Sequence, residues 1–192
     1  MNLTEMYYDE QTFKDLTIFQ EHLSDMEFTS CTFINCDFSE SNFAFSSFDD
    51  CLFKDCNLSL TKFHGSKLRK VLFKETKLAG INFSNCDRFI IDIHFENSLI
   101  QNCAFADLNL KKCQFKHSNI LESDFFDVDL TSCDFTESNL ANSTFVNCNL
   151  EKAKFVNAFN YTIDPTKNKL KKAVFTMPDA VALLKPFNII IK

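Results

Sequence analysis

The chain contains no tryptophan, only two glycines and only three prolines among its 192 residues. This scarcity argues against a loop-rich β-sandwich, because glycine and proline form most of the tight turns in such a fold. The aromatic residues are equally uneven, with 24 phenylalanines against three tyrosines. The composition therefore indicates that one packing environment recurs many times, which is typical of a repeat protein.

Long apolar runs are also missing. No stretch approaches the 18 consecutive apolar residues that a membrane-spanning helix needs. The first ten residues have neither the basic region nor the apolar region of a secretory signal peptide. We therefore expect a cytoplasmic protein that does not interact with membranes.

Motifs for catalysis and cofactor binding are absent from the sequence. There is no G-x-S-x-G, no phosphate-binding glycine loop and no H-E-x-x-H. No two cysteines have the C-x-x-C spacing of zinc and redox sites, and the four histidines share no metal-binding spacing. We predict a protein that is not an enzyme and that has no catalytic residues, no metal and no cofactor.

A five-residue period runs through most of the chain. Residues 9–83 divide into 15 pentads and residues 86–155 into 14 more, and the last residue of all 29 is Phe, Leu or Ile. From Met26 onward the middle residue is almost always small. Because alternate residues of a strand point to the same side, each pentad is predicted to be a short strand with one large and one small inward residue.

The large inward residues also alternate in type from one pentad to the next. From Phe53 to Phe155 phenylalanine alternates with leucine or isoleucine, and Ile90 continues the alternation after two extra residues, Ser84 and Asn85. In a four-sided coil of 20 residues, this period of ten places phenylalanine on two opposite walls and aliphatic residues on the other two. The two extra residues are then an enlarged corner and not a break between domains.

These pentads resemble the pentapeptide-repeat family, whose motif A-(D/N)-L-x-x is represented here by Cys-Asp-Phe, Ser-Asn-Leu and Cys-Asn-Leu. The resemblance covers about residues 26–155. It implies an all-β, right-handed quadrilateral β-helix of about seven coils with a short C-terminal capping helix. We expect an irregular N-terminal cap over 1–24, the β-helix over 25–160 with its insertion at 84–85, and a C-terminal cap over 161–192.

The C-terminal cap is strongly apolar. Residues 176–184 are predicted to form a short helix with Thr176 as its N-cap, ended by Pro186, and residues 187–191 a short strand. Its apolar residues are expected to cover the last coil, because a solenoid must cap its open ends. They also give a candidate interface through which two chains form a homodimer: Phe175, Met177, Val181, Leu184, Phe187, Ile189 and Ile191.

Cysteine is used as a small inward residue. Eight of the nine cysteines occupy the small inward position, and Cys86 beside the insertion is the exception. Three pairs are 20 residues apart, a spacing that stacks their thiols on successive coils. Since cysteine also serves as a small apolar filler, we expect buried, inert thiols.

Charge is distributed in bands. The net charge is −6, but residues 1–50 carry −10, residues 51–85 carry +5, residues 117–151 carry −7 with no lysine or arginine, and residues 152–192 carry +6. The second acidic band gives a candidate partner-binding surface around the outward-facing Phe126. Its predicted residues are Asp107, Glu122, Asp124, Phe126, Asp127, Asp129 and Asp134.

Two functions remain open from the sequence. The chain is similar in size and in its apolar C-terminus to the quinolone-resistance (Qnr-type) pentapeptide proteins. That resemblance implies a dimeric DNA mimic that binds DNA gyrase or topoisomerase IV and does not itself bind nucleic acid. The banded charge and the exposed Phe126 favour the alternative, a scaffold or adaptor for another protein, and the basic band is a second candidate contact surface.

Overall fold

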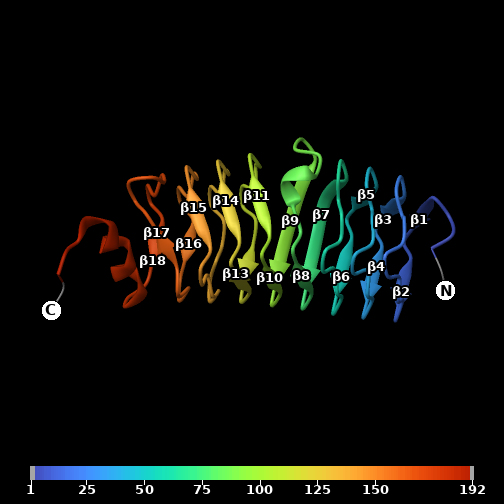
Figure 1. Cartoon of the computed structure of the whole chain (residues 1–192), viewed down its shortest axis with the longest axis horizontal. Coiled ribbons are helices and arrows are strands. Elements are labelled where there is room, and N and C mark those ends of the chain that lie inside the picture. Colours follow the sequence, from blue (N-terminus) through green and yellow to red (C-terminus); the bar gives the residue numbers. More distant parts are fainter. Residues whose placement is uncertain (1–2, 191–192) are drawn as a thin grey trace.

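The computed structural model describes residues 3–190, and its chain forms a four-sided β-helix with the two ends of the chain at opposite ends of the rod (Figure 1). Each coil takes 20 residues over most of the rod, so that Phe28 pairs with Phe48 and Phe125 pairs with Phe145. The rod has about eight coils, one more than the repeat count predicts. The predicted all-β solenoid is confirmed.

The four walls are numbered in chain order. Wall 1 holds β1 (Tyr7–Asp9), β3 (Glu27–Thr29) and β5 (Ser47–Asp49), and wall 2 holds β2 (Thr12–Lys14), β4 (Thr32–Ile34), β6 (Leu52–Lys54), β12 (Phe115–Lys116), β16 (Lys154–Phe155) and β18 (Val174–Phe175). The longer strands β7 (Lys67–Lys74) and β9 (Ile91–Glu96) extend over both of these walls. Wall 3 holds β8 (Lys77–Ala79), β10 (Leu99–Gln101) and β13 (Asn119–Leu121), and wall 4 holds β11 (Ala104–Ala106), β14 (Asp124–Phe126), β15 (Thr144–Val146) and β17 (Thr162–Ile163). All pairings are parallel.

Corners explain how the chain manages with two glycines. The second residue of almost every pentad adopts a positive φ of 50° to 63°, and most of these residues are Asp, Asn, Glu, Lys or Ser. At two corners the residue is bulky: Phe45 and Leu60, both with φ of 60°. Their side chains lie over Gly65 and Gly80 in the next coil, where an added Cβ would approach Phe45 Cδ1 or Leu60 Cδ2 to 2.6 Å. Glycine is therefore used where a side chain of the neighbouring coil needs its space.

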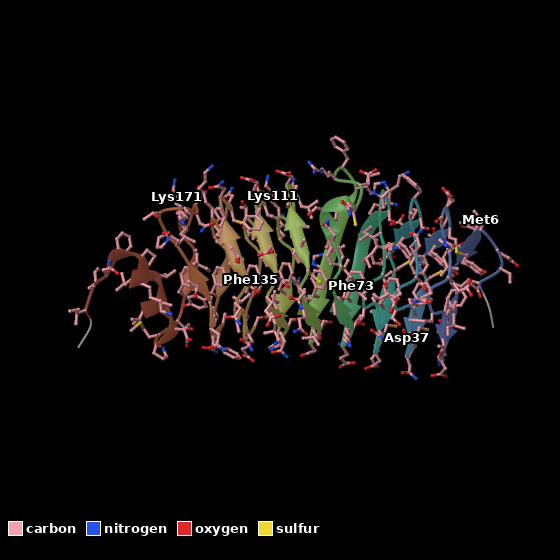
Figure 2. The ribbon with its side chains drawn as sticks, in the orientation of Figure 1. Met6, Asp37, Phe73, Lys111, Phe135 and Lys171 are labelled. Atoms are coloured by element: carbon pink, nitrogen blue, oxygen red, sulfur yellow. The ribbon has the colours of Figure 1, made fainter. Side chains whose placement is uncertain are left out.

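Two phenylalanine walls fill the interior, as the alternation predicts. Wall 2 stacks its rings from Phe13 to Phe175, and wall 4 stacks its rings from Phe43 to Phe145. The two stacks meet edge to face, for example at 6.0 Å between the centroids of Phe135 and Phe145. In Figure 2, Phe73 and Phe135 lie inside the rod on the same wall.

The small inward residues connect successive coils by hydrogen bonds. On wall 3 the backbone N–H of Ser98 donates to Ser118 Oγ at 3.2 Å, and the N–H of Ser118 donates to Ser138 Oγ at 3.2 Å. Ser118 Oγ in turn donates to the carbonyl of Lys116 at 2.9 Å. All three serines are buried. A hydroxyl at this position therefore satisfies a buried N–H that the strand ladder does not reach.

Removing one of these hydroxyls is expected to destabilise the rod. Ser118→Ala leaves the buried N–H of Ser98 without an acceptor, so the free energy of unfolding should fall by about 1–3 kcal/mol. Ser118→Cys is the matched control, because cysteine occupies the same position at Cys113 and Cys133 and its sulfur remains a weak acceptor. Urea unfolding followed by circular dichroism measures both variants. A free energy of unfolding for Ser118→Ala equal to that of the wild type would contradict this role of the hydroxyl, and a loss for Ala that Cys largely restores would support it.

The structure corrects the place of the insertion. Cys86 is buried, and the N–H of Asp87 donates to the carbonyl of Ser66, so the coil stays regular through the expected insertion at 84–85. Three extra residues, 88–90, bulge from wall 1 before Ile91 pairs with Leu68 (Figure 1), and the next corner is one residue shorter, because Val71 pairs with Ile93. Ile90, assigned to the wall by counting, is 37% exposed, and Ile91 packs against the core instead. Counting pentads finds the net gain of two residues but does not locate it.

The β-helix also begins earlier than the predicted cap boundary at residue 24. Tyr8 pairs with Phe28 and stacks on its ring with centroids 5.5 Å apart, so β1 and β2 already belong to a regular coil. Gln11 and Glu21, which occupy small inward positions, are exposed. A polar residue is tolerated there because the first coil has no preceding coil to face.

The C-terminal end differs from the expected helix and strand. The helix is a 3₁₀ helix, η2 (Asp179–Phe187), which contains Pro186 instead of ending before it. Thr176 is not its N-cap, because the Thr176 hydroxyl accepts a hydrogen bond from the N–H of Asn157 at 2.8 Å. Within the described part of 187–191 there is no strand: Asn188 takes a left-handed conformation that directs the chain away from the coils, and Ile191 lies outside the described residues.

In the last complete coil the corner between walls 3 and 4 is two residues shorter than in the other coils, and the corner between walls 4 and 1 regains both residues, since Asn149 still pairs with Lys169. Phe145 pairs with Ile163, 18 residues later, and the wall-3 position after Leu140 has no large inward residue. Tyr161 fills this space with its ring 5.9 Å from Phe155 and 5.6 Å from Phe175. Burial, with a smaller contribution from Asp179, raises the pKa of Tyr161 to about 12. The tyrosine replaces the missing wall residue in the core.

Candidate protein-binding surfaces

The outward side of wall 4 carries an apolar strip. Strand register places Phe126 between Ala106 and Val146 on successive coils, as the 20-residue period predicts. The Phe126 ring is 39% exposed, while the adjacent Phe125 is fully buried in the core. Because the strand sends these two neighbours to opposite sides, the same sequence builds both the core and an exposed aromatic contact.

Four acids surround this strip. Asp107 and Asp127 occupy the corner between walls 4 and 1 and are stacked, since the N–H of Asp107 donates to the carbonyl of Phe126 at 3.0 Å. Asp124 lies on wall 4, and Glu122 lies at the corner with wall 3; all four carboxylates are exposed. We call Asp107, Glu122, Asp124, Phe126 and Asp127 the wall-4 patch. One cation reaches it, Arg88 from the bulge, whose Nη2 is 3.6 Å from Asp107 Oδ2.

The other two predicted acids lie elsewhere. Asp129 is on wall 1 and Asp134 is on wall 2. Asp129 accepts hydrogen bonds from Thr131 Oγ1 at 2.5 Å and Thr131 N at 3.0 Å, and Lys111 Nζ is 3.3 Å from it. Burial raises the pKa of the Asp129 carboxyl, but these hydrogen bonds and Lys111 outweigh it, so the pKa falls below its usual value.

Asp134 has the same arrangement. Its carboxylate accepts from Thr136 Oγ1 and N and lies 3.6 Å from Lys116 Nζ. Burial acts against ionisation, but the Thr136 hydrogen bonds and the lysines lower the pKa of Asp134 overall. Both carboxylates are therefore occupied within the chain, and the geometry does not bring them into the wall-4 patch.

The C-terminal end separates the predicted interface residues into two groups. Phe175 stacks on Phe155 with centroids 4.7 Å apart and so extends the core, while Val181 is half-buried. Ala182 and Leu183 pack against the core and cover the last coil. The remaining large apolar side chains of this end are exposed: Val174, Met177, Leu184, Phe187, Ile189 and Ile190.

Two exposed features were not predicted as sites. Phe89 projects from the bulge and is 97% exposed. On the N-terminal half of wall 4, an open groove of about 890 Å³ runs past His22, Asn42, Leu60 and His64. The position of Phe89 in the irregular stretch after Cys86 was the available signal. The groove lies beside the bulky corner residue Leu60, and no local sequence motif predicts it.

The cysteines form no disulfide in the part of the chain that the structure describes, and a hydrogen bond with Cys56 lowers the pKa of Cys36. All nine cysteines are free and buried. Burial raises the pKa of the Cys103 thiol to about 11 and raises that of Cys51 to about 12. Within residues 3–190 no three His, Cys, Asp or Glu side chains lie close enough to hold a metal ion. In the same range, no helix is long and apolar enough to cross a membrane.

A four-sided coil with one large and one small inward residue per pentad defines a class of protein, and comparison with known families agrees. The family model "Pentapeptide repeat region" matches residues 26–105, and "Pentapeptide repeats (8 copies)" matches residues 123–159. The chain belongs to the pentapeptide-repeat family, and its fold is the right-handed quadrilateral β-helix.

Among solved structures, the chain is similar to QnrB1, described as a plasmid-mediated fluoroquinolone resistance protein. One trypsin-treated variant of QnrB1 has a TM-score of 0.78 at 16% identity, covering 97% of this chain and 99% of that chain. A second trypsin-treated variant has a TM-score of 0.59 at 16% identity with the same coverage. HetL, from the cyanobacterium Nostoc, has a TM-score of 0.41 at 11% identity, covering 90% of this chain and 88% of that chain. No curated protein matches the sequence.

Proposed function

We propose that this protein is non-catalytic, acts in the cytoplasm and binds another protein through the wall-4 patch. The observation that carries the proposal is an exposed Phe126 surrounded by exposed carboxylates on one side of a rigid rod. Residues 117–151 supply seven acids and no lysine or arginine. An aromatic side chain within a charged rim is a typical centre for a protein interface.

The proposed partner is a type II topoisomerase, DNA gyrase or topoisomerase IV, whose DNA-binding surface the acidic patch would occupy. The likeness to QnrB1 supports this choice at the level of the fold. Carboxylates on successive coils, such as Asp107 and Asp127, repeat at about 4.8 Å, which is comparable to the 3.4 Å axial rise per phosphate of one DNA strand. The stacked pair Asp107 and Asp127, with Glu122 and Asp124 beside it, therefore offers a basic groove a short segment of negative charge related to that of duplex DNA.

A supercoiling assay with gyrase, with and without a fluoroquinolone, tests this function. The wild-type protein is expected to inhibit supercoiling or to restore it in the presence of the drug at micromolar concentration. Asp124→Lys with Asp127→Lys should raise the half-effective concentration at least 10-fold, because both changes place cations on a surface that binds a basic groove.

Glu10→Lys with Asp25→Lys is the matched control. It makes the same change in net charge at two exposed corners of the first coil and should leave the effect unchanged. No effect of the wild-type protein in either format would overturn topoisomerase binding and favour the second function. That second function is an adaptor, for which the apolar strip of Phe126 and Val146 is the supporting observation.

We also propose that two chains associate through the C-terminal end. The support is a set of exposed apolar side chains: Leu184 and Phe187 lie on a helix that already covers the last coil through Ala182 and Leu183, and Ile189 follows that helix. A soluble monomer seldom leaves apolar side chains exposed together in this way.

A further inference from the structure

Lysines gather where the last two coils turn from wall 1 to wall 2. The bridge between Asn149 and Lys169 places Lys169 outward on wall 1, and Lys171 follows it on the same side. The N–H of Lys152 donates to the carbonyl of Lys171 at 3.0 Å, so the corner residues Lys152 and Lys172 are stacked. With Lys154 on wall 2 and Lys167 at the preceding corner, these side chains form what we call the C-terminal lysine cluster: Lys152, Lys154, Lys167, Lys169, Lys171 and Lys172.

The charge of this cluster is left largely unneutralised. All six lysines are exposed. Within residues 3–190, Lys167 is the one member with a carboxylate inside 4.0 Å, that of Asp164 at 3.9 Å. Asp134 lies one coil below Lys154, but its oxygens are engaged by Thr136 and Lys116. A cationic surface therefore remains available to an external anion.

Four other lysines of the rod are ion-paired. Lys54, Lys74, Lys111 and Lys116 each lie within 4.0 Å of a carboxylate. Lys111 and Lys171 lie along the same edge of the rod, as Figure 2 shows, yet only Lys111 is paired within the described chain. Lys62, Lys67, Lys70, Lys77 and Lys112 also have no carboxylate within 4.0 Å in the described chain, so what distinguishes the last two coils is that six exposed lysines lie close together there.

The surroundings of the cluster favour a polyanion over a folded acidic protein. On wall 1 its neighbours are Asn149 and Glu151, and Val174, which pairs with Lys154 on wall 2, is the one exposed large apolar side chain that the described residues place directly beside a cluster lysine on a strand. Protein interfaces draw most of their affinity from buried aromatic and apolar anchors, whereas contacts to a phosphate backbone need mainly lysine and arginine. Lysine also supplies a point charge on a flexible stem, which adapts to phosphates without a fixed geometry.

The spacing of the charges fits an extended anion. Side chains on successive coils are about 4.8 Å apart, and side chains two residues apart on one strand are about 7 Å apart. The six lysines therefore form a band that runs from the corner before wall 1, across wall 1, to wall 2. We propose that the C-terminal lysine cluster binds the phosphate backbone of nucleic acid without reading its sequence.

This site goes beyond the proposed function, because the wall-4 patch is acidic and would repel the same ligand. The resemblance to the Qnr-type proteins led us to expect no nucleic-acid binding, but the charge of this chain is banded and the cluster has one sign. The acidic bands limit the affinity, so a dissociation constant on the order of 10⁻⁵ M is expected near physiological salt, as for other non-specific complexes.

Fluorescence anisotropy of the full chain with a labelled 24-base-pair duplex tests the proposal. If all six lysines contact phosphates, affinity should fall about 10³-fold between 50 and 200 mM KCl. The variant Lys169→Gln, Lys171→Gln, Lys172→Gln should weaken binding at least 10-fold at 50 mM KCl and reduce the slope of log affinity against log salt by about three. Weakening should be the same for duplexes of unrelated sequence.

The control variant removes the same charge from the ion-paired lysines: Lys54→Gln, Lys74→Gln, Lys116→Gln. If the duplex affinity of this control stays within about 2-fold of the wild-type affinity, the result supports the cluster as the binding site. Equal weakening by both variants would overturn the assignment, because net charge alone would then explain binding. The absence of any anisotropy change at 50 mM KCl would also overturn it. Displacement of the duplex by poly-glutamate at equal charge concentration would identify an acidic polypeptide as the ligand and reject nucleic acid.

Discussion

Replacing Phe115 with alanine is expected to lower the free energy of unfolding by about 3–5 kcal/mol. The Phe115 ring is fully buried and stacks between Phe95 and Phe135 at 4.9 Å from each centroid. It also meets the edges of Phe105 and Phe125 across the core at 6.1 and 5.9 Å. Since strand ladders on both sides hold these neighbours in place, the cavity cannot collapse, and both transfer and packing energy are lost.

Chemical unfolding in urea, followed by far-ultraviolet circular dichroism, measures this effect. Phe115→Leu is the first control: leucine fills the equivalent position at Leu110 and Leu130, so the loss should be about 1–2 kcal/mol. Phe126→Ala is the second, and because this ring lies outside the core it should change stability by about 0.5 kcal/mol or less. If Phe115→Ala destabilised no more than Phe126→Ala, the stacked walls would have to relax freely, against the packing described here.

The walls could be predicted because a β-helix repeats one local rule. A residue at the end of a pentad faces inward wherever it occurs, so Phe105 and Phe125 must be stacked once the coil has 20 residues. The same rule placed Phe126 outward beside Val146. Facing directions and neighbours on successive coils are therefore readable from sequence, because they depend on the period alone.

Departures from the period could not be located in this way. The bulge at 88–90 and the shortened corner before Tyr161 change the local residue count without a motif that marks their place. Cys86 did carry a signal, because the other cysteines all occupy inward positions and it lies 20 residues after Ser66. At the first coil, polar inward residues such as Gln11 suggested irregular structure, although the backbone ladder is already formed.

The position of the candidate site could be predicted from the sequence, but which of its acids are paired with lysines could not. The wall-4 patch follows from the period, whereas the pairing of Asp129 with Lys111 depends on the reach of a side chain across coils. The threonine two residues after both Asp129 and Asp134 was an available clue, since a hydroxyl there bonds the carboxylate in a local turn. An acid that is followed two residues later by threonine forms a local turn of the coil. Such an acid is a poor choice for a predicted partner contact.

At the C-terminal end, Leu184→Asp with Phe187→Asp is expected to convert a dimer into a monomer. Both side chains are exposed on η2, at 38% and 50%, while Leu183 on the same helix packs against the core. The changes should therefore leave the cap in place and act on the contact between chains. Carboxylates buried in an apolar interface repel each other and lose their hydration. The dimer dissociation constant should therefore rise at least 10³-fold.

Sedimentation equilibrium between 1 and 100 μM measures the mass of both proteins. Lys185→Asp is the matched control, because it lies between the two positions on an exposed site that is already polar, and it should leave the dimer intact. A wild-type chain that sediments as a monomer over this range would reject the C-terminal dimer outright. Equal unfolding temperatures for the wild type and the double variant at low concentration, where both are monomeric, would show that the helix covers the last coil without help from a second chain.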